Sequence, residues 1–302
     1  MNSINRRVFL KTSVMTSGAI AMMSFSGIHR KTSKNKLAFS TLGCPTWDLR
    51  QIVDFAAKHQ YAGIELRGLN GEIDLRKSPY LTTGLSETKR MLSDRGLKVV
   101  NLGSSAQMHH AEATEKQKHL DEAKAYVDLA HKLDCPFVRV FPEKLGDDKE
   151  GSKGRIAENL LTLGKHAQGS NVAILLESHG ELVYSKDLVD VMTRSAHNNV
   201  GLIWDVMNMW AVTGESPAQV YPQLSKFIKH VHLKDGVKSN GKINYVLLGK
   251  GDAPVKDAID QLKKGKYSGY YSFEWEKLWH PEIAEPEVAF AHYSQEIAKY
   301  LK

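Results

Sequence analysis

From Leu37 to the end of the 302-residue chain, short apolar runs alternate with longer amphipathic runs. The apolar runs have the length of buried strands, and the amphipathic runs have the period of helices. Eight such pairs follow one another without a low-complexity linker. Repeated strand–helix units predict a parallel sheet with helical crossovers. Residues 37–302 therefore fit one (β/α)8 TIM barrel, a fold of typically ~250 residues.

The individual elements can be placed from this pattern. A doubly wound sheet is the alternative, but Gly43-Cys44-Pro45 after the first strand is not the glycine-rich phosphate turn GxGxxG. We therefore expect the barrel. Its strands are predicted at 37–42, 61–66, 97–103, 137–141, 172–177, 200–205, 227–234 and 270–274. Its helices are predicted at 48–59, 85–95, 114–133, 154–168, 186–196, 217–224, 254–264 and 286–300.

The first 36 residues have the composition of an export signal. The pair Arg6-Arg7 lies in a charged start and precedes a mildly apolar run at 14–28. This order is typical of a signal peptide, and the paired arginines resemble the twin-arginine motif. The apolar run is too short and too polar for a transmembrane helix, which needs about 20 apolar residues. We expect residues 1–36 to be a twin-arginine signal and linker, residues 37–302 to be the single domain, and the protein to be periplasmic. Membrane contact is expected only through an uncleaved signal.

The basic charge of the chain comes from this signal. Residues 1–36 hold seven of the 41 Lys and Arg residues and no acid, so 34 basic residues face 34 acidic ones in the remainder. A neutral domain lacks the basic surface of a nucleic-acid-binding protein. We expect no nucleic-acid partner. A homo-oligomer is compatible with the sequence.

Two cysteines are present, Cys44 and Cys135. An oxidising compartment permits a disulfide. However, Cys44 follows a predicted strand and Cys135 precedes one, which places them at opposite ends of a parallel barrel. We expect two free thiols, and no CxxC or Cys/His zinc pattern is present.

Most of the predicted strands end in a polar side chain that can take part in catalysis or bind a metal. Barrel enzymes place their chemistry at these carboxyl ends. One acid or histidine at a strand end is usually structural, but the fifth to eighth strands all end in one. The strand ends are Glu65, Asn101, Arg139, Glu177, Asp205, His232 and Glu274.

Glu177, Asp205, His232 and Glu274 form a predicted divalent-metal site. Three converging carboxylates repel one another unless one is protonated or a cation lies between them. Three oxygen ligands and one imidazole suit Mn2+, Mg2+, Co2+ or Zn2+, and we expect Mn2+. Glu276 is the rival of Glu274, because the side-chain period of a strand is two. Glu274 is favoured because it directly follows the apolar run.

The chain resembles the sugar phosphate isomerase/epimerase superfamily, the xylose isomerase-like barrels, from Leu37 to its C-terminus. The resemblance rests on four segments, LLESHG, IWDVMN, HVHLKD and SFEWEK, which contain Glu177, Asp205, His232 and Glu274. In that family Glu, Asp, His and Glu of the last four strands hold one metal. The resemblance therefore implies that these residues bind the metal, which acts as a Lewis acid on an enediolate. It also implies that Glu177 and Glu274 are the acid/base pair.

One departure from the family concerns the substrate. The family often has Asp-x-x-His after the sixth strand, whereas this chain has Asn208, which can hydrogen-bond but cannot carry a proton. Further substrate-binding candidates are Arg139, His179 and Lys234. Their alternatives are an Arg139 pair with Glu65, an exposed loop histidine and a Lys234 salt bridge with its chain neighbour. His230 is expected to lie behind His232 as a core or supporting histidine.

These observations predict a metal-dependent isomerase or epimerase that acts on a non-phosphorylated carbohydrate. A lyase or hydrolase of 3-keto-glycosides is the close alternative, because the same enediolate can lose a β-substituent. The segment 274–281 supports it, since it resembles exported family members found beside carbohydrate-degradation systems. An apurinic endonuclease on the same fold needs more histidines. A non-catalytic sugar-binding protein has no need of four metal ligands.

Overall fold

The structure is a computed structural model that describes residues 36–239 and 241–302. The predicted export signal, apart from Lys36, lies outside the described residues. No helix in the described part of the chain has both the length and the apolar character needed to cross a bilayer.

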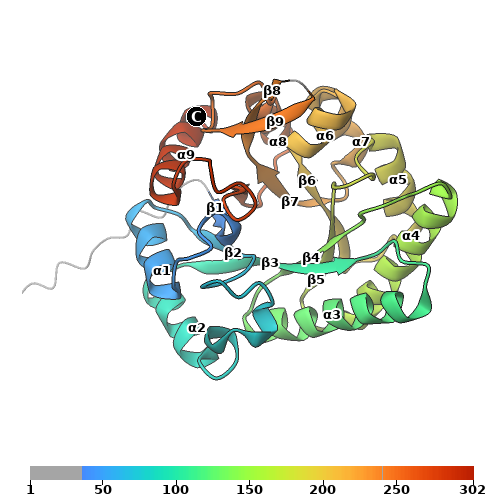
Figure 1. Cartoon of the computed structure of the whole chain (residues 1–302), viewed down its shortest axis with the longest axis horizontal. Helices are drawn as coiled ribbons and strands as arrows, with labels where there is room; N and C mark the ends of the chain where they lie inside the picture. Colours follow the sequence, from blue (N-terminus) through green and yellow to red (C-terminus); the bar gives the residue numbers. More distant parts are fainter. Residues whose placement is uncertain (1–35, 240) are drawn as a thin grey trace, which may run out of the picture. The chain divides into compact units, whose positions relative to one another are not determined.

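Eight parallel strands close into a barrel in the order β1-β10-β7-β6-β5-β4-β3-β2. Figure 1 shows these strands with helices arranged around them. The predicted (β/α)8 fold is confirmed. The barrel strands are β1 Leu37–Ser40, β2 Gly63–Leu66, β3 Lys98–Gln107, β4 Phe137–Phe141, β5 Ala173–Glu177, β6 Val200–Asp205, β7 Ile228–Leu233 and β10 Tyr271–Phe273.

The eight predicted helices are all present, but α4 Lys149–His166 begins well before its predicted start at residue 154. Several of them have a side-chain start signal. At the first helix, for example, the Asp48 side chain accepts the N–H of Gln51 while the Gln51 side chain accepts the N–H of Asp48. Such a capping box satisfies backbone donors that the first turn leaves free. The helices are α1 Leu49–Lys58, α2 Leu85–Asp94, α3 Ala113–Lys132, α4 Lys149–His166, α5 Ser185–Arg194, α6 Val206–Thr213, α7 Pro217–Leu224, α8 Val255–Lys264 and α9 Pro286–Tyr300.

Two elements near the later strands were not predicted. The short helix α6 follows β6 directly. After β7 the chain forms an antiparallel hairpin of β8 Asp235–Ser239 and β9 Lys242–Val246. The hairpin lies outside the barrel sheet, so its strands lack the continuous apolar runs by which the barrel strands were recognised.

Strand register brings the predicted site residues to one level. Asp205 on β6 is the register partner of His232 on β7, and His232 is the partner of Ser272 on β10. Glu177 is the last residue of β5, and Glu274 follows the last residue of β10. The four ends therefore meet at the carboxyl face of the barrel.

Both cysteines are buried free thiols. Burial raises the pKa of Cys44 well above its usual range and raises that of Cys135 to about 12. The two thiols therefore behave as core side chains.

Candidate active site

The structure brings Glu177, Asp205, His232 and Glu274 together at the carboxyl end of the barrel. Each of the four offers a ligand atom, and these atoms all lie within 4.8 Å of one another. All four side chains are buried. Three carboxylates and an imidazole at this spacing have the donor chemistry of a divalent-metal centre.

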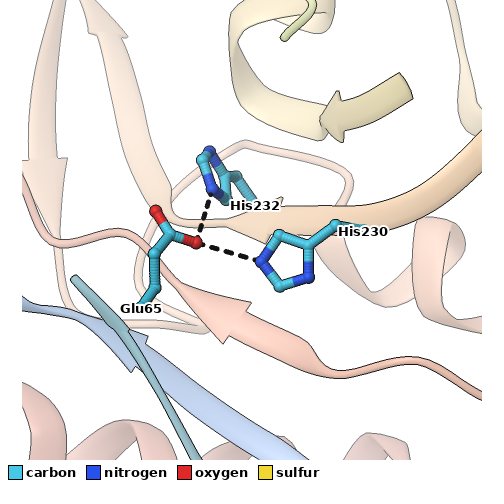
Figure 2. A group of neighbouring side chains, drawn as sticks. All are labelled: Glu65, His230 and His232. Atoms are coloured by element: carbon cyan, nitrogen blue, oxygen red, sulfur yellow. Dashed lines mark hydrogen bonds and ion pairs between the residues drawn. The ribbon is translucent and has the colours of Figure 1, made fainter. Parts of the chain in front are cut away.

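Glu65, at the end of β2, orients His232. Nε2 of His232 and Nε2 of His230 each lie 3.0 Å from the same oxygen of Glu65, as Figure 2 shows. The histidines lower the pKa of Glu65 despite its burial, so the carboxylate is ionised and accepts both N–H groups. His230 is thus the supporting histidine that its position behind His232 predicted.

The remaining ring nitrogen of His232 faces the predicted metal ligands. Its Nδ1 lies 3.1 Å from Oε1 of Glu177 and 3.3 Å from Oε1 of Glu274. A metal-binding histidine commonly donates its other N–H to a carboxylate, which fixes the ring and its tautomer. In this chain Glu65 is the carboxylate that accepts the other N–H of His232. The residues present therefore fit a divalent metal.

A buried lysine lies among the same carboxylates. Nζ of Lys234 is 2.7 Å from Asp205 Oδ2 and 2.7 Å from Glu276 Oε1, and it also contacts Glu274 Oε2. The alternative of a Lys234–Asp235 pair is not what the structure shows. The Asp235 carboxylate instead accepts backbone N–H groups of residues 236, 249, 251 and 253. Lys234 therefore balances the carboxylates at the site.

Arg139 was expected at the end of its strand but lies in the middle of β4, where it balances Glu177. Its Nη1 donates to Oε2 of Glu177 over 2.6 Å, and its guanidinium lies 3.7 Å from the ring centre of Phe141. The alternative Glu65 partner is thus replaced by Glu177. Gly103 makes room for Arg139, because a Cβ there would lie 2.9 Å from Nη2.

Among the predicted carboxylate ligands, Glu177 has a lowered pKa and Asp205 has a raised one. Burial and Glu274 act to raise the pKa of Glu177, but His232 and Arg139 outweigh them and lower it to about 2. Burial prevails at Asp205 and raises its pKa to about 6 in spite of Lys234. Burial opposes the charged imidazolium of His232, but Glu274, Glu65 and Glu177 raise its pKa well above its usual range. A metal therefore has to displace the His232 proton, which makes metal binding proton-linked.

A cavity of about 230 Å³ opens onto these residues. Two larger hollows lie at the amino ends of β6 and β7 and of β3, away from the predicted ligands. The active-site cavity is therefore assigned by its chemistry and not by its size. It is lined by Leu42, Arg67, Arg139, Phe141, Glu177, His179, Glu274, Glu276 and Trp279.

The structure places the two remaining substrate-binding candidates, His179 and Asn208, differently. His179 lines the cavity, and its Nδ1 lies 3.4 Å from Glu143 Oε1. Burial lowers the pKa of His179, but the Glu143 carboxylate outweighs it and raises that pKa above its usual value. Asn208 does not line the cavity; its backbone N–H donates to Asp205 Oδ1 at the start of α6. Asn208 thus supports a predicted ligand through its backbone.

Sequence reasoning missed Arg67 and undervalued Glu65 and Trp279. Arg67 and Glu65 are two residues apart on the second strand and its extension, so their side chains share one face of the sheet. That spacing could have identified Arg67. Trp279 lines the cavity and is 56% exposed, and its only sequence signal was its place in the segment 274–281.

A second histidine group has unsuitable hydrogen bonding for a metal. His110, Glu115 and His119 offer ligand atoms close together. However, the backbone N–H of Gln107 donates to Nδ1 of His119 over 3.2 Å. The neutral ring then carries its proton on Nε2, the nitrogen nearer Glu115 at 3.8 Å. This group is better explained as packing.

The chain belongs to the xylose isomerase-like TIM barrel family, whose family model matches residues 53–293. No curated protein matches it significantly. Solved structures share the fold at low identity. The IOLI protein with a bound zinc atom has a TM-score of 0.75 and 19% identity, over 88% of this chain and 99% of that chain.

Two epimerases are also similar. The 3-keto-D-glucoside 4-epimerase of E. coli has a TM-score of 0.69 and 14% identity, over 89% of this chain and 99% of that chain. D-Psicose 3-epimerase of Clostridium cellulolyticum H10, solved with D-tagatose, has a TM-score of 0.70 and 16% identity. The match covers 88% of this chain and 98% of that chain. At these identities the likeness shows the fold alone.

Proposed function

We propose that this member of the xylose isomerase-like TIM barrel family is a divalent-metal-dependent isomerase or epimerase of a non-phosphorylated sugar or sugar derivative. The observation that carries the proposal is the convergence of Glu177, Asp205, His232 and Glu274 within 4.8 Å beside a cavity. The family and the two similar epimerases support an enzyme of this class. The twin-arginine sequence supports export to the periplasm as part of the proposal.

The four residues would hold the metal, with Mn2+ as the proposed ion. Zn2+, Co2+ and Mg2+ fit the same donors, and the similar IOLI structure holds zinc. When bound, the metal supplies a Lewis acid that stabilises negative charge on the carbonyl oxygen of an enediolate. The cavity accommodates a small carbohydrate.

Glu177 and Glu274 are the proposed acid/base pair. Both line the cavity, and both have pKa values below the ordinary range because His232 and a neighbouring base outweigh their burial. They are therefore carboxylates at neutral pH, the form that removes a proton α to a carbonyl. Arg139 holds one oxygen of Glu177 and Lys234 holds one of Glu274. The other oxygen of each faces His232 and the predicted metal position.

A lyase or hydrolase of 3-keto-glycosides is the second candidate, and a specific observation favours it. A second cavity of about 260 Å³ shares Arg67 and Trp279 with the first. Its wall is mainly apolar and contains Leu69, Ile73 and Leu278. A leaving group attached to the reacting sugar could occupy this space.

The test is proton exchange with solvent. Metal-loaded residues 37–302 and the Glu274→Gln variant would be incubated in deuterated water with plain hexoses, with a 3-keto-glucoside and with hexuronates. We expect wild type to place deuterium in a sugar and the variant to lose exchange at least a hundredfold, the scale of general acid–base catalysis. A stereoisomer as product identifies the epimerase, and aglycone release identifies the lyase. Equal exchange in wild type and variant, or none in either, would refute the proposal.

A further inference from the structure

Arg67 is a buried guanidinium with no ion-pair partner among residues 36–239 and 241–302. Its side chain extends from the carboxyl end of β2, and the residue is only 7% exposed. Nη2 donates to Ser105 Oγ over 3.1 Å, and Nη1 has no hydrogen-bond partner among the described residues. Arg139, beside it, is paired with Glu177. A charge taken out of water without a partner is costly, so an unpaired buried guanidinium requires an explanation.

The two carboxylates that act electrostatically on Arg67 have other partners. Those of Glu122 and Glu274 act on Arg67 from beyond ion-pair distance. Glu122 accepts the backbone N–H of Ser105 over 2.7 Å, and Glu274 contacts Lys234. Burial and the like charge of Arg139 lower the pKa of Arg67 to about 10, which still leaves it cationic at neutral pH. The described part of the chain therefore buries a cation here without pairing it with an anion.

The position of Arg67 is that of a ligand contact. It lines both the cavity beside the predicted metal ligands and the adjoining apolar cavity. Gly103 permits this position, since a Cβ there would lie 2.6 Å from Cδ of Arg67. The cavity beside the predicted metal ligands is also lined by Glu177, Glu274 and Glu276. A ligand with one negative charge meets less repulsion from these carboxylates than a phosphate dianion would.

We propose that Arg67 binds a carboxylate of the substrate, so that the enzyme acts on a sugar acid. This inference rests on the proposed function and specifies its substrate class. The planar guanidinium matches a carboxylate in shape and in hydrogen-bonding geometry. The reacting carbons of the sugar would lie toward Glu177 and Glu274, with the carboxylate at the Arg67 side of the cavity.

Binding to matched pairs of ligands tests the inference. Metal-loaded wild type would be titrated calorimetrically with D-glucuronate and D-glucose, and with D-galacturonate and D-galactose. Each pair differs chiefly in the carboxylate. We expect the acid to bind at least tenfold more tightly than its neutral partner, as a charge-assisted hydrogen bond provides. If no acid binds more tightly than its neutral partner, the inference is wrong.

Three variants give the residue-level test. Arg67→Met is expected to weaken acid binding ten- to one-hundredfold and to leave binding of the neutral sugar unchanged. Arg67→Lys keeps the charge and should recover part of the loss. Arg50→Met, on the exposed side of α1, is the control and should change neither. Equal weakening of acid and neutral sugar by Arg67→Met would overturn the inference.

The two proposals can fail separately. Acid-selective binding that depends on Arg67, without deuterium exchange into any sugar, would refute the enzyme and retain the carboxylate site. Exchange into neutral sugars with no preference for acids would retain the enzyme and refute the carboxylate site. Should Arg67→Met fold poorly, the wild-type comparison and Arg67→Lys still decide the question.

Discussion

Replacing Lys234 by Met should make the fold dependent on a divalent metal. The Lys234 side chain is 1% exposed and touches three carboxylates, those of Asp205, Glu274 and Glu276. One such contact at 2.7 Å corresponds to about 6 kcal/mol of attraction at an effective dielectric constant of 20, before desolvation is subtracted. Removing one member of a buried ion pair costs roughly 3–5 kcal/mol net, because the partner charge remains buried. Without metal, the free energy of unfolding of Lys234→Met should therefore be about 3–5 kcal/mol below that of wild type.

The pKa shifts of Lys234 and Glu274 decide the pH at which the stability of the variant should be compared with that of wild type. Burial opposes the charge of Lys234, but Asp205, Glu274 and Glu276 raise its pKa well above its usual range, so its contribution is complete below about pH 10. Burial likewise opposes the charge of Glu274, but His232 and Lys234 lower its pKa, so its contribution is complete above about pH 5 and is lost in acid. Both contributions are present at pH 7, where the difference should be largest.

Thermal and urea unfolding at pH 7, with EDTA or with Mn2+, provide the assay. A loss of 3–5 kcal/mol lowers Tm by about 6–20 °C in a domain of this size. Mn2+ should raise the Tm of Lys234→Met more than that of wild type, because the metal replaces the missing positive charge. Lys229→Met is the control; Lys229 is on the same strand and makes one 3.0 Å hydrogen bond to Asn198. If Lys234→Met in EDTA lost less than about 1 kcal/mol of unfolding free energy, the value of a single hydrogen bond, this account of the site would be wrong.

Three further perturbations have definite expected outcomes. Gly103→Val should cost about 1–3 kcal/mol by overpacking and lower kcat/KM by displacing Arg67; full activity and unchanged Tm would contradict the crowding. Asp235→Ala should cost at least about 1–3 kcal/mol in urea unfolding, since buried N–H groups lose their acceptor; a neutral effect would show that water replaces the carboxylate. Cys44 and Cys135 should react with a thiol reagent only in denaturant, because burial raises both pKa values; rapid reaction of the native protein at pH 8 would refute this.

The convergence of the four candidate metal ligands was predictable because they follow a rule of the fold. In a parallel barrel all strand ends face one side, so the last residues of β5 and β6, the last but one of β7 and the residue after β10 had to converge. The burial of Glu274 beside Glu177 could be expected from this rule. The apolar run of the strand favoured Glu274 over Glu276, and the structure places both in contact with Lys234.

Other residues depended on contacts between segments far apart in the chain. The pairing of Arg139 with Glu177, the three partners of Lys234 and the position of Asn208 outside the cavity have no local signal. The hairpin β8–β9 was missed because its exposed strands do not show the apolar run of a barrel strand.

The sequence by itself determined the barrel, the order of its elements and the edge at which four ligand-type side chains meet. Hydrophobic period and strand-end position are local properties, and local properties can be read along a chain. Only the tertiary structure decided which charges are paired. Arg139 in the middle of β4 and Arg67 just after β2 are both buried, yet Arg139 has Glu177 as its ion-pair partner and Arg67 has no such partner in the described part of the chain. Charge pairing depends on distances of a few ångströms between side chains from different strands, and those distances exist only after the barrel has closed.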